Sequence, residues 1–157
     1  MTKEHAMSSE TDTSPNIEMP TALEHRWHQL RLVESRVSEQ LEHALQREHE
    51  LTLSEFCALA ALAYSDDGGH LRQQILAEAI PLNQSSVSRL VGRLENDGLT
   101  ERYLCPTDRR GVYTQITDRG RNKLLQARPT YLRVLEYALG EIGRDDYLGR
   151  VLTGLVE

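Results

Sequence analysis

Apolar residues recur at intervals of three and four along most of this chain, and this spacing predicts amphipathic helices. The first stripe begins at Thr21 and runs to about Arg47. A capping box, Thr52-x-x-Glu55, then opens a second helix over about 53–64, which ends at a Gly-rich turn. Further helices are predicted over about 71–80, from Asn83 to Gly98, from Thr117 onward with a kink or break at Pro129, and over about 145–156.

A tight turn and a pair of strands interrupt this helical pattern. Pro81 ends one helix and Asn83 is a good N-cap for the next, so the two helices form a helix-turn-helix. Over 99–104 and 112–116 the apolar spacing changes to two, and the polar loop 105–111 between them contains Pro and Gly. The predicted fold class is mainly α with a small β-hairpin wing: a winged helix-turn-helix lobe plus a helical dimerisation region.

Charge is unevenly distributed in a way that the net value of −6 conceals. Between Asn83 and Arg121 there are seven arginines and five carboxylates, so this segment carries +2 and the rest of the chain carries −8. An acidic chain is not a general nucleic-acid binder, but a segregated basic segment is compatible with one DNA-binding face. The polar N-terminus has no signal-peptide pattern, and no apolar run approaches the roughly 20 residues of a membrane span. We therefore expect a cytoplasmic protein with no membrane partner.

The helix that starts at Asn83 is the main candidate for contact with DNA. Its apolar stripe of Val87, Leu90, Val91 and Leu94 predicts an opposite face of hydroxyl, amide and guanidinium groups with almost no carboxylate. Such groups suit base edges and phosphates. The candidate residues on this helix are Gln84, Ser85, Ser86, Ser88, Arg89 and Arg93.

The loop of the predicted wing supplies the other candidates. Arg109 and Arg110 suit a narrow minor groove, where negative potential is concentrated. Asp108 beside them is expected to hold one of the two guanidinium groups in a fixed orientation. The alternative is an exposed turn with a weak surface ion pair.

Other chemistries find little support in the sequence. It has no Gly-rich phosphate loop, no nucleophile elbow and no His-Glu-x-x-His pair, so we expect no enzyme and no cofactor. All six histidines lie at or before His70, which argues against a regulatory metal site. Cys57 is expected to be a buried, inert thiol, and Cys105 has no neighbouring cysteine to pair with.

The runs SSVSRLVGRLENDGLTER (85–102) and CPTDRRGVYTQITDRGR (105–121) closely resemble the MarR family of transcription regulators. The resemblance covers about 51–125 and departs from the common pattern at Pro81, where Gly is usual, and at Cys105, where Asp is usual. It implies a homodimer that binds an inverted repeat in double-stranded DNA as a repressor, with Arg110 entering the minor groove. The expected organisation is a flexible tail (1–20), a dimerisation helix (21–50), a DNA-binding lobe (51–120) and C-terminal dimerisation helices (121–157).

The same resemblance implies a pocket for a small aromatic acid between the dimer helices and the lobe. The residues expected to line it are Trp27, His28, Arg31 and Tyr64. Trp27 is also a good candidate for an ordinary core residue. The alternative function is a protein–protein interaction module that uses a helix-turn-helix fold without binding DNA.

Overall fold

A computed structural model describes residues 18–145 and 148–156 of the chain, so most of the predicted N-terminal tail lies outside the described residues. The chain is mostly helical and also contains a small antiparallel sheet, as predicted. The elements in order are α1 (Ala22–His49), α2 (Leu53–Ala63), β1 (His70–Arg72), α3 (Gln73–Ala79), α4 (Gln84–Asn96), β2 (Thr100–Tyr103), β3 (Tyr113–Ile116), α5 (Asp118–Gly143) and α6 (Gly149–Val156).

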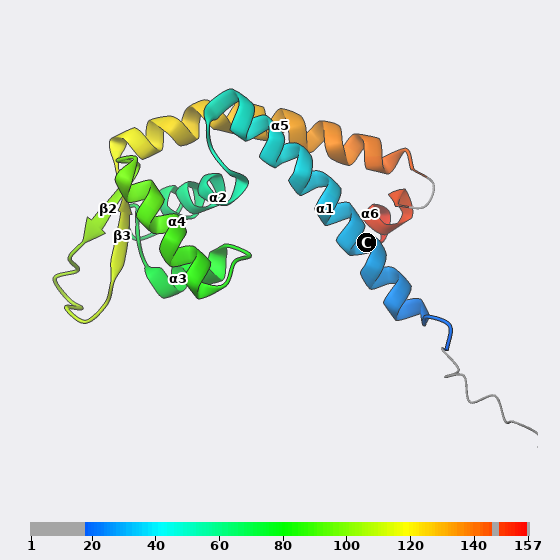
Figure 1. Cartoon of the computed structure of the whole chain (residues 1–157), viewed down its shortest axis with the longest axis horizontal. Helices are drawn as coiled ribbons and strands as arrows, with labels where there is room; N and C mark the ends of the chain where they lie inside the picture. The colour runs from blue at the N-terminus through cyan, green and yellow to red at the C-terminus, as the bar shows by residue number, and fades with distance from the viewer. Residues whose placement is uncertain (1–17, 146–147, 157) are drawn as a thin grey trace, which may run out of the picture.

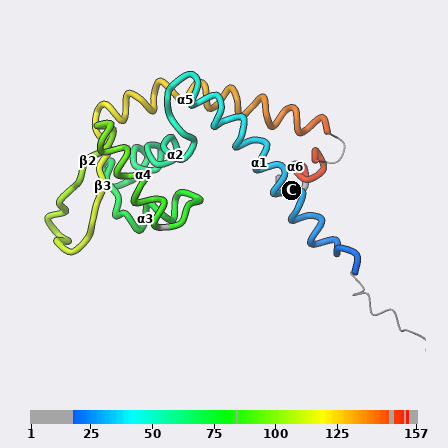
Figure 2. Tube along the Cα trace, viewed as in Figure 1, coloured from blue at the N-terminus to red at the C-terminus, as the bar shows by residue number. Residues whose placement is uncertain are grey.

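The short helices and the sheet form one compact lobe beneath two long helices, α1 and α5 (Figure 1). The hairpin of β2 and β3 projects from one end of the molecule, and α6 lies at the other end beside α1. The trace in Figure 2 follows the chain from α1 down into the lobe and back out along α5. The lobe is therefore built from the middle of the sequence.

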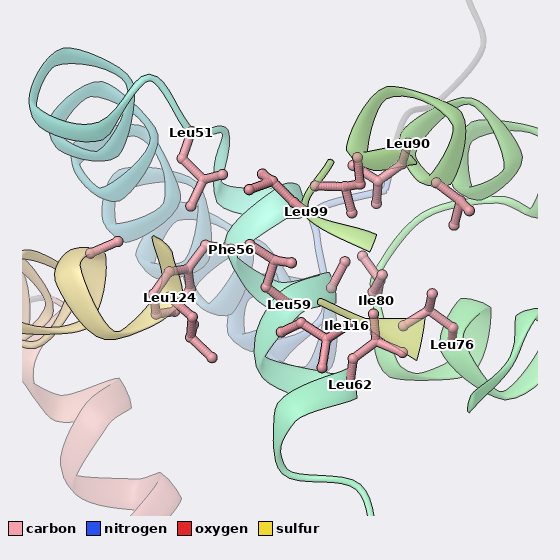
Figure 3. Packing of buried hydrophobic residues seen from close by; sticks show 14 of the residues in the cluster. Leu51, Phe56, Leu59, Leu62, Leu76, Ile80, Leu90, Leu99, Ile116 and Leu124 are labelled. Atoms are coloured by element: carbon pink, nitrogen blue, oxygen red, sulfur yellow. The ribbon is translucent and has the colours of Figure 1, made fainter. Parts of the chain in front are cut away.

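The core of the lobe consists of aliphatic side chains from nearly every element around it (Figure 3). The predicted stripe of α4 is buried, with Leu90 and Leu94 fully inaccessible to solvent, and it packs against Leu59 and Leu62 of α2 and against Leu76 of α3. Burying one such leucine stabilises the fold by about 1.5–3 kcal/mol. This packing fixes which face of α4 points inward, and so which face remains for a ligand.

The long helices pack on each other more extensively than any other pair of elements. A polar joint holds them together: the buried Thr130 hydroxyl donates to Glu48 Oε2 at 3.0 Å and lies 2.8 Å from His49 Nε2. Arg133 donates to the same carboxylate at 2.9 Å. Pro129 lies beside this joint inside α5, and the helix continues through it without the predicted break.

Three parts of the sequence prediction needed correction. A helix was predicted over about 71–80, but residues 70–72 form a strand, β1, which pairs with β3 and makes the sheet three-stranded in the order β1-β3-β2. Helix α3 therefore begins at Gln73, and Ile75 and Ala79, whose spacing predicted that they point inward, are exposed. The last helix begins at Gly149 rather than at about residue 145.

Candidate nucleic-acid interface

The exposed face of α4 begins at a well-formed N-cap. Asn83 Oδ1 accepts the Ser86 N–H at 2.9 Å and the Ser85 hydroxyl at 2.8 Å. An N-cap of this kind satisfies one of the free amide groups at the start of the helix. Ser85, Ser88 and Arg89 are exposed and Ser86 is half-buried, while the side chain of Gln84 lies outside the described residues.

The two arginines of α4 have different surroundings. Arg93 Nε donates to Glu55 Oε1 at 3.2 Å, and Glu55 is a buried carboxylate that also accepts the Thr52 N–H at 2.9 Å in the capping box of α2. Arg93 therefore links α4 to the start of α2. Arg89 is exposed and forms no ion pair within the described part of the chain. Of the two guanidinium groups, that of Arg89 is the one left for a ligand.

The wing carries its two predicted arginines at the tip, between β2 and β3. Arg109 and Arg110 are exposed, and neither forms an ion pair with any residue that the structure describes. Their side chains are thus available to an anionic partner, although Asp108 lies next to them in the sequence.

Asp108 does not hold either of these guanidinium groups, so this prediction was wrong. Its Oδ2 lies 3.2 Å from Arg72 Nη2 and accepts the Tyr113 hydroxyl at 3.1 Å. Its Oδ1 accepts the backbone N–H of Arg110 at 3.1 Å and that of Gly111 at 3.2 Å. Short aspartate side chains favour such hydrogen bonds to the backbone two and three residues onward. Asp108 therefore shapes the backbone of the loop and leaves the two arginine side chains free.

The electrostatics of the wing follow from these contacts. The hydrogen bond from the Arg110 backbone lowers the pKa of Asp108, helped by the Tyr113 hydroxyl and the charge of Arg72. Burial, followed by the hydrogen bond to Asp108, raises the pKa of Tyr113. The wing therefore holds an ionised carboxylate at neutral pH, and Arg72 balances its charge. Sequence reasoning missed Arg72, because its partner is distant in the sequence and β1 was not predicted.

A groove lies between α2 and α5, with a volume of about 790 Å³. Phe56 and Tyr131 stack on its wall with ring centroids 4.4 Å apart, and Tyr64 and Arg128 also line it. Of the four residues predicted for an effector pocket, only Tyr64 is present. Trp27, His28 and Arg31 lie on the exposed N-terminal half of α1, and none of them lines the groove within one chain.

The cysteines and acidic residues form no further centre in the described ranges. Burial raises the pKa of Cys57, and a hydrogen bond with Thr107 lowers that of Cys105. No group of three or more His, Cys, Asp or Glu residues within 18–145 and 148–156 could hold a metal ion. The helices described are also too short or too polar to cross a bilayer.

Comparisons with known proteins find similar transcription regulators. The model of the MarR family matches residues 49–111. Transcriptional regulator HosA of Escherichia coli O111:H- is 26% identical over 125 residues, which are 80% of this chain and 82% of HosA.

Two crystal structures of MarR family regulators from Streptomyces coelicolor are similar over most of their length. AbsC superposes with a TM-score of 0.72 and 26% identity, covering 88% of this chain and 93% of AbsC. Sco3205, solved in complex with DNA, gives a TM-score of 0.71 and 26% identity over 90% of this chain and 91% of its own.

Proposed function

We propose that this chain, which is similar to MarR family transcription regulators, is a repressor of that family that binds an inverted-repeat operator as a homodimer. The observation that carries the proposal is the exposed face of α4, whose N-terminal half presents Ser85, Ser88 and the unpaired Arg89 without a carboxylate. Arg109 and Arg110 of the wing add a second basic element. In a related complex, Sco3205 was solved with DNA.

The different roles proposed for α4 and the wing follow from the chemistry of the two DNA grooves. An arginine in the major groove can donate two hydrogen bonds to guanine, which specifies a base. The minor groove carries a degenerate pattern, so arginines at a wing read mainly its width and potential. We assign base recognition to α4, with Arg89 as its charged contact, and minor-groove contact to Arg109 and Arg110. Ser85, Ser86, Ser88, Gln84 and Arg93 are assigned supporting or phosphate contacts.

Footprinting on genomic fragments selected by the protein tests this function. We expect protection of an inverted repeat whose half-sites are centred about one helical turn, roughly 10 base pairs, apart. Affinity should fall steeply with salt, because arginine–phosphate contacts release counterions. A single asymmetric footprint would contradict dimeric binding. The absence of any mobility shift on DNA would favour the protein–protein interaction module instead.

The homodimer is supported by apolar side chains on the long helices that a single chain leaves uncovered. Leu23 and Trp27 on α1 are 76% and 60% exposed, and Tyr137 on α5 is 63% exposed. Exposed apolar surface of this extent on adjacent helices is typical of an interface. Sedimentation of Trp27→Asp should show dissociation that the wild type does not show. Ile75→Asp, on α3 of the lobe and 47% exposed, is the matched control that should remain dimeric.

We also propose that a small aromatic acid binds the groove between α2 and α5 and changes DNA affinity. The aromatic wall of Phe56, Tyr64 and Tyr131 suits a planar ring, and Arg128 suits a carboxylate. Leu71 lines the groove and adjoins Arg72, which contacts the wing, so a ligand there has a short route to the DNA-binding elements.

The predicted contribution of Trp27, His28 and Arg31 to this pocket requires a second copy of the chain, because within one chain they lie outside it. Titrating benzoate-type acids against the operator complex, with Arg128→Gln as the variant that should lose the response, tests the proposal.

A further inference from the structure

Arg72 occupies a position where helices rarely place an arginine. It ends β1 and is the N-cap residue of α3, yet its side chain makes no capping hydrogen bond. Ser, Thr, Asp and Asn are preferred at N-caps because their oxygens accept a free amide hydrogen. A residue that breaks a local rule without local gain often serves a contact elsewhere. Here that contact is with the wing.

The guanidinium of Arg72 meets the wing inside a tightly packed cluster. Nη2 lies 3.2 Å from Asp108 Oδ2, and the Tyr113 hydroxyl donates to the same oxygen at 3.1 Å. A Cβ on Gly111 would lie 2.6 Å from Asp108 Oδ2 and 3.0 Å from Arg72 Nε, and it would overlap the Tyr113 ring. A side chain at this position would displace the groups of the ion pair, so the backbone of the wing passes directly against that pair.

Backbone hydrogen bonds fix the same two segments to each other. Arg72 pairs with Tyr113 across β1 and β3, and the Gln73 N–H at the start of α3 donates to the Val112 carbonyl at 2.9 Å. The base of the wing is therefore held by main-chain bonds. Beyond Val112, toward the tip, the Arg72–Asp108 contact continues this attachment.

We propose that Arg72 is a positioning residue for DNA binding, which acts through Asp108 to order the wing tip before DNA arrives. One carboxylate oxygen of Asp108 forms the ion pair with Arg72. The other accepts hydrogen bonds from the N–H groups of Arg110 and Gly111 and so fixes the shape of the loop. Ordering a binding loop in advance removes an entropy cost from association. The inference rests on the proposed function, since it assumes that the arginines of the wing contact DNA.

A double-mutant cycle with Arg72→Gln and Asp108→Asn tests this proposal. Asp108→Asn retains an amide oxygen for the two backbone N–H groups but loses the charge that faces Arg72. Affinity for the selected operator is measured at several salt concentrations, and hydrogen exchange of the Arg110 and Gly111 amides is measured without DNA. Arg47→Gln is the matched control, because it removes an exposed arginine whose ion pair with Glu48 lies outside the lobe.

Three results are expected if Arg72 acts through Asp108. Arg72→Gln weakens operator binding by about three- to tenfold, the range of a surface-accessible ion pair together with lost loop order. The double variant binds no more weakly than the weaker single variant. The two wing amides exchange several-fold faster in Arg72→Gln, while Arg47→Gln changes neither affinity nor exchange.

Two results would overturn the proposal. If Arg72→Gln loses the same factor in the Asp108→Asn background as in the wild type, Arg72 contacts DNA itself. If affinity and amide exchange are both unchanged, the ion pair orders nothing. The exchange measurement needs no DNA, so it tests this inference independently of the proposed function. Failure of the proposed function would appear separately, as a wild-type protein that binds no DNA. A thermal unfolding midpoint equal to that of the wild type confirms that each variant is folded.

Discussion

Replacing Arg89 and Arg93 separately by alanine should give two different losses, although both arginines belong to the same helix. Arg89 is exposed and unpaired within the described chain, so its removal affects DNA and not the fold. A bidentate arginine–guanine contact discriminates by about 1–3 kcal/mol, so Arg89→Ala should weaken operator binding by about fivefold to 150-fold. Urea unfolding of this variant should match the wild type.

For Arg93 the structure predicts a measurable effect on stability and a smaller effect on DNA affinity. Its side chain is 55% exposed, so its ion pair with Glu55 contributes only about 0.2–1 kcal/mol. Glu55 keeps its hydrogen bond from the Thr52 N–H, which limits the cost of leaving a buried carboxylate without Arg93. Arg93→Ala should therefore lower the free energy of unfolding by about 1 kcal/mol or less and weaken operator binding less than Arg89→Ala does.

Fluorescence anisotropy on operator and scrambled DNA, paired with urea unfolding, separates these outcomes. Arg89→Lys is the informative control, because it keeps the charge but loses the two-pronged geometry: it should lose operator affinity and retain affinity for scrambled DNA. If both alanine variants lost operator affinity equally and neither lost stability, the assignment of Arg93 to the joint with α2 would be refuted. Wild-type affinity in Arg89→Ala would mean that α4 does not present this face to DNA.

Further predictions concern the core, the joint between the long helices and the wing. Leu90→Ala should lower the free energy of unfolding by about 2–5 kcal/mol through the cavity it leaves, whereas Ile75→Ala, at a half-exposed site, should cost much less in the same urea titration. The Arg47 hydrogen bond, followed by those of Thr130 and Arg133, lowers the pKa of Glu48 to about 2. Its contribution to stability is therefore complete above pH 4.5 and is lost as the pH falls toward about 2. Glu48→Gln should flatten the fall of Tm over this range, and an identical acid limb in the variant would contradict the role of Glu48. Gly111→Ala should weaken operator binding and speed exchange of the wing amides while leaving those of α4 protected, and equal loosening of both elements would show a global defect instead.

Sequence reasoning predicted the elements whose determinants are local. The N-caps at Thr52, Asn83 and Thr117 are confirmed, and the buried stripe of α4 follows from its spacing alone. Strand β1 was missed because three residues give no alternating pattern, and the run that follows them favours helix. Its pairing with β3, more than forty residues later, decides its conformation, and such pairing leaves no local signal.

The candidate site shows the same limit. The exposed position of Arg89 could be predicted from helical spacing, because one face of α4 must be buried. The partner of Asp108 could not, because Arg72 reaches it only through the sheet. The residues of the groove were also mostly missed: Phe56, Arg128 and Tyr131 come together only when α5 packs against α2.

The order of strands in the sheet has a consequence for how the hairpin can fray. β3 lies in the middle with a neighbour on each side, whereas β1 and β2 are edge strands with one neighbour each. Thermal opening of either edge strand should therefore leave β3 paired with the other one. Arg109 and Arg110 lie closer in sequence to the start of β3 than to the end of β2. The arm that leads to the two arginines is thus attached to the strand that loses its last pairing partner only when both edge strands have opened.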